Sequence, residues 1–228
     1  MKRITIVTGH YGSGKTEFSL NLALKLACRG KKTALVDLDI ANVYFRSRER
    51  QQLLEDNGVE VHSNAYHYDI TADLPALSPS IRKPLEDVSY HTIIDVGGDH
   101  SGARILNQFS KYFGSNQTEM LCVINANRPE TDTVEGALYH IFRIQEETGL
   151  RVEGLINNTH LLRETKIEDI LKGYQLCKSL SDKLKIPVTY NCCVEELCNQ
   201  LEEKNKEQLD NFAVFPMKLY MRPSWLDR

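Results

Sequence analysis

A glycine-rich segment near the start of the sequence constrains the fold of this chain more than any other feature. Residues 9–16 read GHYGSGKT, which fits the pattern G-x-x-x-x-G-K-[ST]. Glycines let successive backbone N–H groups turn inward and form a nest for phosphate oxygens. The segment follows the β-branched run Ile4–Thr8 and opens the amphipathic pattern Lys15–Cys28. This strand–loop–helix context favours a phosphate-binding loop over a glycine turn that matches by chance.

Each position of this loop has an expected role. The positive end of the following helix attracts anions. We expect Lys15 to reach the β- and γ-phosphates of a nucleotide and the Thr16 hydroxyl to ligate Mg²⁺. The loop residues expected at the nucleotide are Gly9, Gly12, Ser13, Gly14, Lys15, Thr16 and Glu17.

Short apolar runs alternate with longer helical patterns along the chain. The runs are Ile4–Thr8, Thr33–Asp37, Val59–His62, His91–Val96, Met120–Asn125, Val152–Asn157 and Pro187–Tyr190, with a weaker one near Ala213–Pro216. Nearly continuous β-branched runs are typical of strands buried on both faces of a parallel sheet. The alternation predicts an α/β fold: a doubly wound, mostly parallel sheet of about seven or eight strands with helices on both faces. We expect residues 1–228 to form a single nucleotide-binding domain, with its core at about 3–200 and a tail at about 205–228.

Local signals place helix starts and one insertion. Asp132 with Glu135, and Thr165 with Glu168, have the spacing of capping boxes before further helices. The Pro-rich stretch of residues 74–84 is interpreted as a surface insertion around a short helix, because the strand pattern resumes directly after it.

Composition excludes several classes of function. The formal net charge is −3 and the pI is near 6.2, which argues against a dedicated nucleic-acid-binding protein. No apolar stretch approaches the roughly 20 residues of a membrane span, and no export signal is recognised, so we expect a cytoplasmic protein with reduced thiols.

The spacing of the late cysteines does not match a structural zinc site. We expect all the cysteines to be small buried hydrophobic residues: Cys28, Cys122, Cys177, Cys192, Cys193 and Cys198.

Two further segments carry carboxylates at predicted strand ends. HTIIDVGG at residues 91–98 is an apolar strand that ends in Asp95, expected to hold Mg²⁺, and the D-x-x-G spacing brings the backbone of Gly98 toward the γ-phosphate. Asp37 and Asp39 point the same way if strand geometry persists. We favour Asp39 as the group that orients the attacking water and Asp37 on the metal side; a loop-capping pair is the alternative.

These motifs together give two sets of chemical residues. The expected catalytic residues are Lys15, Asp39 and Asp37. The expected metal ligands are Thr16, Asp37 and Asp95.

The loop, the D-x-D and the D-x-x-G together resemble the MinD/ParA/CobQ branch of P-loop NTPases, over roughly residues 3–200. That branch includes the nitrogenase iron protein and ATPases that mature carbon monoxide dehydrogenase. More narrowly, TGHYGSGKTEF, VDLDIANVYFRSRE, DVGGD and LINNTHL look like a small clostridial-type family described only as ATP-binding proteins. The resemblance implies a nucleotide-driven switch with a protein partner, in metallocentre assembly or partner regulation.

One position departs from this branch. Its members commonly carry a lysine directly after the first loop glycine, which reaches the nucleotide of a partner subunit. Here that position is His10, and an imidazole is shorter and mostly neutral near pH 7. This argues against activation across a homodimer, although the dimer itself stays open. Arg46, Arg48 or Arg104 could supply the positive charge, and the sequence selects none of them.

The sequence favours adenine over guanine. The Asn-Lys-x-Asp tetrad of guanine sites is absent. Asn157 and Asn158 end a late predicted strand instead, and an asparagine amide can both donate to and accept from adenine. The resemblance places the adenine contact at Asn158, with Asn157 in reserve; both could instead cap a turn. We expect the backbone of the chain after residues 186–188 to form the wall of the nucleotide site beside the base.

The leading hypothesis is therefore a Mg²⁺-dependent ATPase switch that binds ATP and ADP, with slow turnover in the absence of its partner. The alternative is a small-molecule kinase or ATP-dependent ligase, similar to dethiobiotin synthetase, in which Arg46, Arg48 and Arg128 would hold an anionic acceptor. A DNA-partitioning or membrane-cycling role is disfavoured by the net charge of −3.

Overall fold

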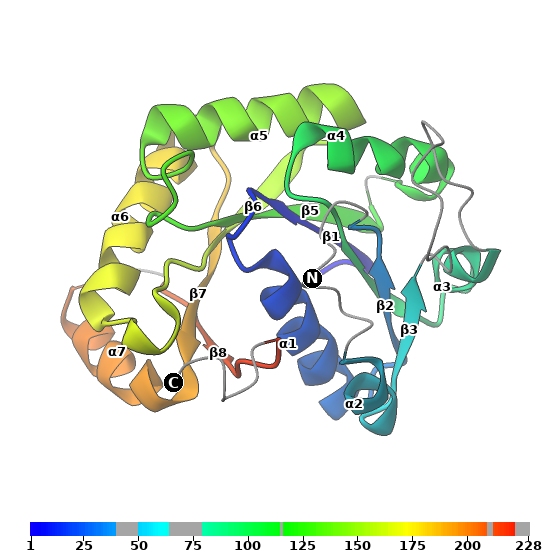
Figure 1. Ribbon diagram of the computed structural model, residues 1–228, viewed down its shortest axis with the longest axis horizontal. Coiled ribbons are helices and arrows are strands. Elements are labelled where there is room, and N and C mark those ends of the chain that lie inside the picture. The colour runs from blue at the N-terminus through cyan, green and yellow to red at the C-terminus, as the bar shows by residue number, and fades with distance from the viewer. Residues whose placement is uncertain (40–49, 64–78, 115, 209–211, 222–228) are drawn as a thin grey trace.

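The structure is a computed structural model that describes residues 1–39, 50–63, 79–114, 116–208 and 212–221 (Figure 1). Eight strands form one sheet in the order β3-β2-β4-β1-β5-β6-β7-β8, and every neighbouring pair is parallel. The strands are β1 Ile4–Gly9, β2 Thr33–Asp37, β3 Val59–Ser63, β4 His91–Asp95, β5 Thr118–Ile124, β6 Val152–Asn157, β7 Val188–Val194 and β8 Val214–Met217. The predicted doubly wound parallel sheet is confirmed.

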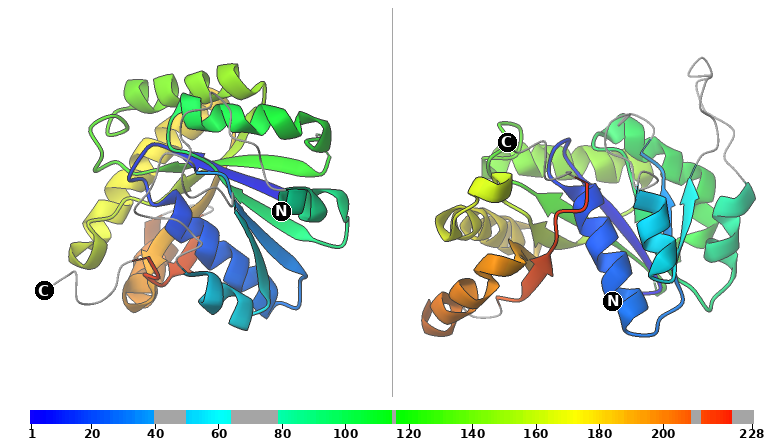
Figure 2. Two further views of the ribbon diagram at one scale, coloured as in Figure 1. Left: turned by 45° about the vertical axis from the view of Figure 1, so that its right-hand side comes forward. Right: turned by 60° about the horizontal axis from the view of Figure 1, so that its bottom comes forward.

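Helices cover both faces of this sheet. They are α1 Lys15–Cys28, α2 Gln51–Asp56, α3 Lys83–Glu86, α4 His100–Ala103, α5 Val134–Thr148, α6 Ile167–Leu184 and α7 Glu195–Gln208. Short 3-10 turns are η2 Pro79–Arg82, η3 Arg104–Tyr112 and η4 Leu162–Glu164. Figures 1 and 2 show α1 and α2 on one face and α4 and α5 on the other. None of the described helices is long and apolar enough to cross a membrane.

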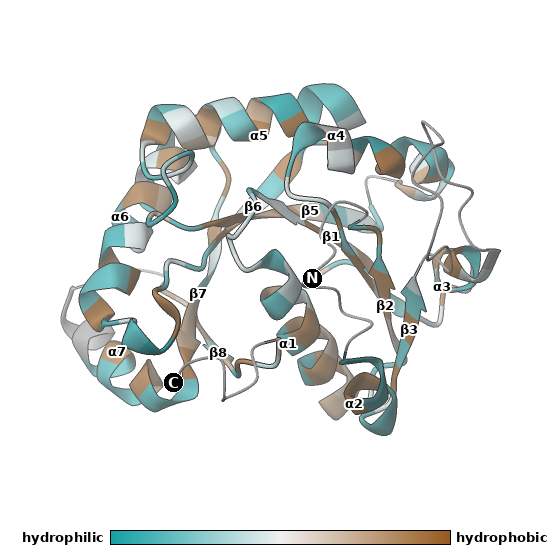
Figure 3. Ribbon diagram, in the orientation of Figure 1, coloured by the Kyte–Doolittle hydropathy of each residue, from teal (hydrophilic) through white to brown (hydrophobic). Residues whose placement is uncertain are grey.

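Alternate residues of the central strands pack into different cores on the two faces of the sheet. In β1, Ile4 and Ile6 pack into the core under α5 and α6, whereas Val7 packs with Phe18 and Leu22 of α1 on the other face. All of these side chains are at most 2% exposed. Apolar residues run along the strands and recur at intervals on the helices (Figure 3). The polar residues at the ends of the strands lie at the carboxyl edge of the sheet.

The strand register sets the site at that edge. Val7 of β1 pairs with Asp95 of β4, and Asp37 of β2 pairs with the same Asp95. The two carboxylates are therefore neighbours across the sheet at the point where both strands end. In open α/β sheets ligands bind beside the carboxyl ends of the strands.

Two predicted helix starts are shifted by one residue. The N-cap of α5 is Thr133, whose hydroxyl accepts from Gly136 N at 3.1 Å, in place of Asp132. The helix α6 is preceded by Lys166, whose N–H donates to the Asp169 carboxylate at 2.9 Å. A sequence with several capping residues in succession does not fix which one takes the extended backbone angles of a cap.

The expectation of a surface insertion at residues 74–84 is wrong for the part that the structure describes. Ile81 is 0% exposed and Leu85, in the helix that follows, is 2% exposed, and both belong to the core beneath α5. Proline at the start of short helices is compatible with burial because the missing N–H is not needed there.

The expectation that Cys28 lies in the core is also wrong, because Cys28 is exposed at the end of α1. The other five cysteines are buried, and burial raises the pKa of Cys122 to about 12. Since the thiolate is the reactive form, we expect one thiol of the native protein to react rapidly with a disulfide reagent such as DTNB. Cys28→Ser should abolish this fast phase, whereas a fast phase that persists in Cys28→Ser would contradict the burial of the other five.

Candidate functional site

The phosphate-binding loop joins β1 to α1 at the centre of the sheet. Gly14 has a φ of +81°, and a Cβ at this residue would lie 2.2 Å from Nδ2 of Asn158. Only glycine combines this left-handed angle with such a close neighbour. Ser13 N donates to His10 O at 3.0 Å and closes the turn. Local sequence thus fixes the left-handed backbone at Gly14 and the tight turn before it.

Lys15 forms a buried ion pair at the base of this loop. Its Nζ lies 3.3 Å from Oδ2 of Asp39, and the two side chains are only 4% and 2% exposed. Asp39 N in turn donates to Oδ1 of Asp37 at 3.1 Å. Removing one partner of a buried ion pair strongly destabilises a folded protein, because the other charge is left buried without compensation. Lys15 therefore sits where its charge is available to a phosphate that competes with Asp39.

Asp95 is the most deeply buried carboxylate of the site, at 0% exposure. Burial raises the pKa of Asp95 to about 7; Asp37 and Asp39 add to this rise, while Lys15 and the Thr16 hydroxyl oppose it. Ser19 Oγ donates to Oδ1 of Asp95 at 3.4 Å. The crowded carboxylates of Asp37, Asp39 and Asp95 carry more negative charge than Lys15 balances.

The oxygen atoms near Asp95 suit a hard divalent cation. Carboxylate and hydroxyl oxygens are the ligands that Mg²⁺ prefers, and the ion usually keeps several waters and takes phosphate oxygens as well. Among the described residues no three His, Cys, Asp or Glu side chains form a complete metal site. The donor set of Thr16, Asp37 and Asp95 therefore fits an ion that arrives with a nucleotide, rather than one caged by protein alone.

Gly98 brings a second backbone segment to the loop. A Cβ at Gly98 would lie 2.7 Å from Tyr11 N and 3.2 Å from the carbonyl carbon of His10. The D-x-x-G turn after β4 thus lies directly against the first half of the phosphate loop. A side chain there would push the two segments apart.

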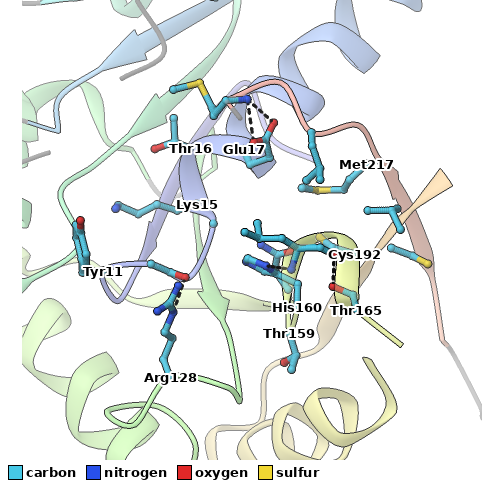
Figure 4. A pocket seen from close by; sticks show the side chains of 18 residues that line it. Tyr11, Lys15, Thr16, Glu17, Arg128, Thr159, His160, Thr165, Cys192 and Met217 are labelled. Carbon is cyan, nitrogen blue, oxygen red and sulfur yellow. Dashed lines mark hydrogen bonds between the residues drawn. The ribbon is translucent and has the colours of Figure 1, made fainter. Parts of the chain in front are cut away.

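A pocket of about 210 Å³ extends from the loop toward β7 and β8 (Figure 4). Its polar end is formed by the phosphate loop, and its far end is apolar, with side chains from the end of β7 and the chain after β8. The residues of the far wall are Cys192, Cys193, Val194, Met217, Leu219 and Met221. Such a slot, with a phosphate site at one end and apolar walls at the other, matches the shape and polarity of a nucleotide.

The two asparagines at the end of β6 have different surroundings. Asn158 lines the pocket and donates through Nδ2 to Ser13 O at 2.8 Å. Asn157 points the other way: its Nδ2 donates to Ile170 O and to Asn191 Oδ1, each at 2.9 Å, and it is 0% exposed. The structure therefore brings Asn158 to the pocket and places Asn157 in the packing between β6, β7 and α6.

Glu17 acts on the wall of the pocket. Its carboxylate accepts the N–H of Tyr220 at 2.5 Å and that of Met221 at 3.1 Å. Asn21, one turn later on α1, accepts from Lys218 N at 2.8 Å. The first turns of α1 thus hold the chain after β8 across the pocket, and the structure shows the Glu17 carboxylate engaged with backbone.

The four arginines considered in the sequence analysis differ in position. Arg128 lies at the pocket rim and donates through Nε to Gly12 O at 3.0 Å. Arg104 pairs with Glu147 of α5 at 2.6 Å, on the surface. Arg46 and Arg48 lie outside the described residues.

Sequence reasoning missed part of the pocket. The wall from Met217 to Met221 was not foreseen, although β8 was expected as a weak strand. The signal was available, since every strand of a parallel sheet delivers the residues after it to the same edge. The loop after β6 also lines the pocket through Thr159, His160 and Thr165.

The sequence matches the family described as the CobQ/CobB/MinD/ParA nucleotide binding domain over residues 4–216. None of the curated proteins compared with this chain matches it significantly.

Solved structures similar to this one include FtsY proteins and a signal recognition particle protein. Chloroplast FtsY from Physcomitrella patens has a TM-score of 0.57 at 20% identity, covering 83% of this chain and 58% of that one. FtsY from Thermotoga maritima has a TM-score of 0.54 at 22% identity, covering 82% and 60%. The 54 kDa signal recognition particle protein of Aeropyrum pernix K1, in complex with GDP, has a TM-score of 0.51 at 21% identity, covering 81% and 40%.

This chain thus spans 40–60% of the length of those proteins, and at such identity the likeness concerns the fold. The match over residues 4–216 covers nearly the whole sequence, and the chain belongs to the CobQ/CobB/MinD/ParA nucleotide-binding domain family of P-loop proteins.

Proposed function

We propose that this protein is a Mg²⁺-dependent ATPase that works as a nucleotide-driven switch. The observation that carries the proposal is the buried Lys15–Asp39 pair at 3.3 Å, at the base of the phosphate loop. An incoming γ-phosphate competes with Asp39 for the lysine. Once Lys15 binds phosphate, the Asp39 carboxylate can orient a water molecule for attack.

The residues of the strand ends divide the remaining work. Thr16, Asp37 and Asp95 would hold Mg²⁺, which when bound neutralises charge on the phosphate oxygens. Backbone N–H groups of the loop hold the phosphates, and Gly98 lies against the loop where it can respond to the terminal phosphate. Catalysis of this kind is mainly positioning and charge stabilisation.

Two observations support ATP as the nucleotide. The sequence lacks the guanine-reading Asn-Lys-x-Asp tetrad. Asn158 lies in the pocket with its Nδ2 engaged by Ser13 O, so its Oδ1 is the atom that can accept from the amino group of adenine. Asn157 is engaged in packing, so we assign the base contact to Asn158 alone.

The switch would act on a protein partner. Lys15 and Asp39 join the phosphate site to the end of β2, so the loss of the γ-phosphate restores their ion pair and changes what Asp39 contacts. Among the described residues no cluster offers a metal cargo site, so we favour regulation of a partner over metal carriage by this chain. A homodimer remains one form that such a partner could take.

The test is calorimetry of the purified protein with Mg²⁺ and ATP, ADP or GTP. We expect ATP to bind more tightly than GTP, and Lys15→Ala to weaken ATP binding about 10- to 100-fold, the equivalent of one or two charge-assisted hydrogen bonds. Lys172→Ala, an exposed lysine on α6 that contacts Asn127, is the matched control and should bind as wild type does. Equal ATP affinity of wild type and Lys15→Ala would overturn the proposal, and tighter binding of GTP would overturn the choice of base.

A further inference from the structure

Two histidines from distant parts of the sequence meet beside the first turn of the phosphate loop. The ring centroids of His10, in the loop, and His140, on α5, are 5.3 Å apart in an edge-to-face arrangement with an interplanar angle of 72°. His140 is only 9% exposed. Its Nε2 is buried and has no hydrogen-bond partner among the described residues. A buried polar atom without a partner is uncommon and calls for a ligand or a function.

Several titratable groups surround His140. The groups that act on its charge are His10 and Lys15 from the loop and α1, Asp99 from the chain between β4 and α4, and His100 at the start of α4. Burial and then repulsion by His10 and Lys15 lower the pKa of His140 to about 4, with Asp99 opposing. His10 in turn faces Glu130, with Nδ1 3.8 Å from Oε2, and lies 3.1 Å from Tyr11 O. Near neutral pH the buried imidazole of His140 is therefore uncharged.

An anion in the loop reverses this balance. A phosphate beside Lys15 offsets the positive charge that keeps His140 neutral, and an opposite charge nearby favours the protonated form of a histidine. His140 is buried on α5 against the His10 ring, so a protonated pair beside a bound phosphate would give its buried Nε2 a charged partner.

We propose that His10 and His140 form a proton-coupled sensor of the γ-phosphate: when ATP occupies the loop, the pair takes up one proton from solvent and holds it against the terminal phosphate. The proton returns to solvent when the phosphate leaves. The inference rests on the proposed function, since it takes the γ-phosphate to lie beside Lys15. ADP lacks that phosphate and should draw little or no proton.

Proton uptake on ATP binding fixes the direction in which ATP affinity changes with pH. Binding that takes up a proton tightens as pH falls, and the gain is present below the pKa of the bound state and lost above it. For a bound-state value near the ordinary histidine pKa of about 6.5, ATP affinity should rise about fourfold between pH 8 and pH 6. Replacing His140 should remove this rise.

The experiment is calorimetry at pH 6 and pH 8 with Mg²⁺ and a non-hydrolysable ATP analogue or ADP, each in two buffers of different ionisation heat. Wild type should take up a large fraction of a proton with the analogue at pH 6. His140→Gln and His10→Gln, whose amides do not titrate, should lose most of that uptake and the fourfold pH effect. His91→Gln, at the amino end of β4 on the opposite edge of the sheet, is the matched control. Protonation of the nucleotide itself is common to all variants and cancels in the difference.

Unchanged proton uptake and pH dependence in folded His140→Gln would overturn the inference. Imidazole NMR signals of the wild type, assigned through the backbone, give a second test that needs no variant: the pKa of His140 should rise on addition of the analogue, and a pKa of His140 that stays fixed rejects the sensor. Failure of the proposed function is distinguishable, because Lys15→Ala would then bind ATP as tightly as wild type does.

Discussion

Asp39→Asn is expected to lower ATP turnover about 100- to 1,000-fold while ATP affinity stays equal or becomes tighter. Proton transfer and water orientation by a positioned carboxylate typically contribute about 10²–10⁴-fold. The amide cannot accept a proton from water in the same way, so the chemical step is lost. The amide also cannot compete for Lys15, which lies 3.3 Å from Oδ2 of Asp39, so the lysine becomes more available to the phosphates.

The Lys15–Asp39 ion pair leads us to expect that Asp39→Asn changes ATP binding and ATP turnover in different ways. A calorimetric dissociation constant and a phosphate-release rate, measured on the same preparation with Mg²⁺, are sufficient to test it. Asp56→Asn, at an exposed aspartate at the end of α2, is the matched control and should change neither quantity. Full turnover in Asp39→Asn would show that Asp39 is not the catalytic carboxylate, and a loss of affinity of tenfold or more would show that the pair does not restrain Lys15.

The sheet and the core of the site follow from the sequence for physical reasons. β-branched runs that are buried on both faces have few alternatives to parallel strands, which is why β2 and β6 have the bounds expected from the apolar pattern alone. Parallel strands put their carboxyl ends at one edge. This placed Asp37 and Asp95 in the same region before their register, with the two residues paired directly, was known.

The asparagines at the end of β6 show where such reasoning stops. Neighbouring residues of an extended chain point to opposite sides, so either Asn157 or Asn158 could face the pocket, and no local signal decides which. The decision is made by tertiary partners: Asn191 and the Ile170 carbonyl engage Asn157, and the phosphate loop takes Asn158.

Contacts between distant segments are likewise invisible to periodicity and motifs. His10 and His140 are 130 positions apart in the sequence, yet their rings are in contact. The position of Met221 at the pocket depends on the hydrogen bond from its N–H to Glu17. The exposure of Cys28 is a similar case. An apolar pattern shows which helix has a buried face, but the last residue of that helix can lie beyond the sheet that covers it.

Asp95→Asn is expected to stabilise the protein without nucleotide at alkaline pH and to raise the Mg²⁺ concentration that turnover requires. The folded pKa of Asp95 is raised to about 7 from an ordinary value of 3.8, chiefly by burial. A raised carboxyl pKa favours folding below the unfolded value, and that contribution falls as pH rises toward the folded value. Wild type should therefore lose about 2 to 4 kcal/mol of unfolding free energy between pH 4 and pH 8 through this group, at about 1.4 kcal/mol per pKa unit. Asparagine carries no charge and does not incur this loss.

Urea unfolding in EDTA at pH 5, 6.5 and 8 measures the difference. The stability curves of wild type and Asp95→Asn should diverge as pH rises, with the variant more stable at pH 8, because its Oδ1 can still accept from Ser19 Oγ. Asp87→Asn is the contrasting control: Ser89 and Lys32 lower the pKa of this exposed carboxyl to about 2, so its loss should not stabilise the protein at high pH. With Mg²⁺ and ATP the order reverses, since the wild-type carboxylate gains the cation that the buried cluster lacks and the variant does not. Parallel curves, or a variant whose turnover is half-maximal at the same Mg²⁺ concentration as wild type, would remove Asp95 from the metal site and leave its burial without a function.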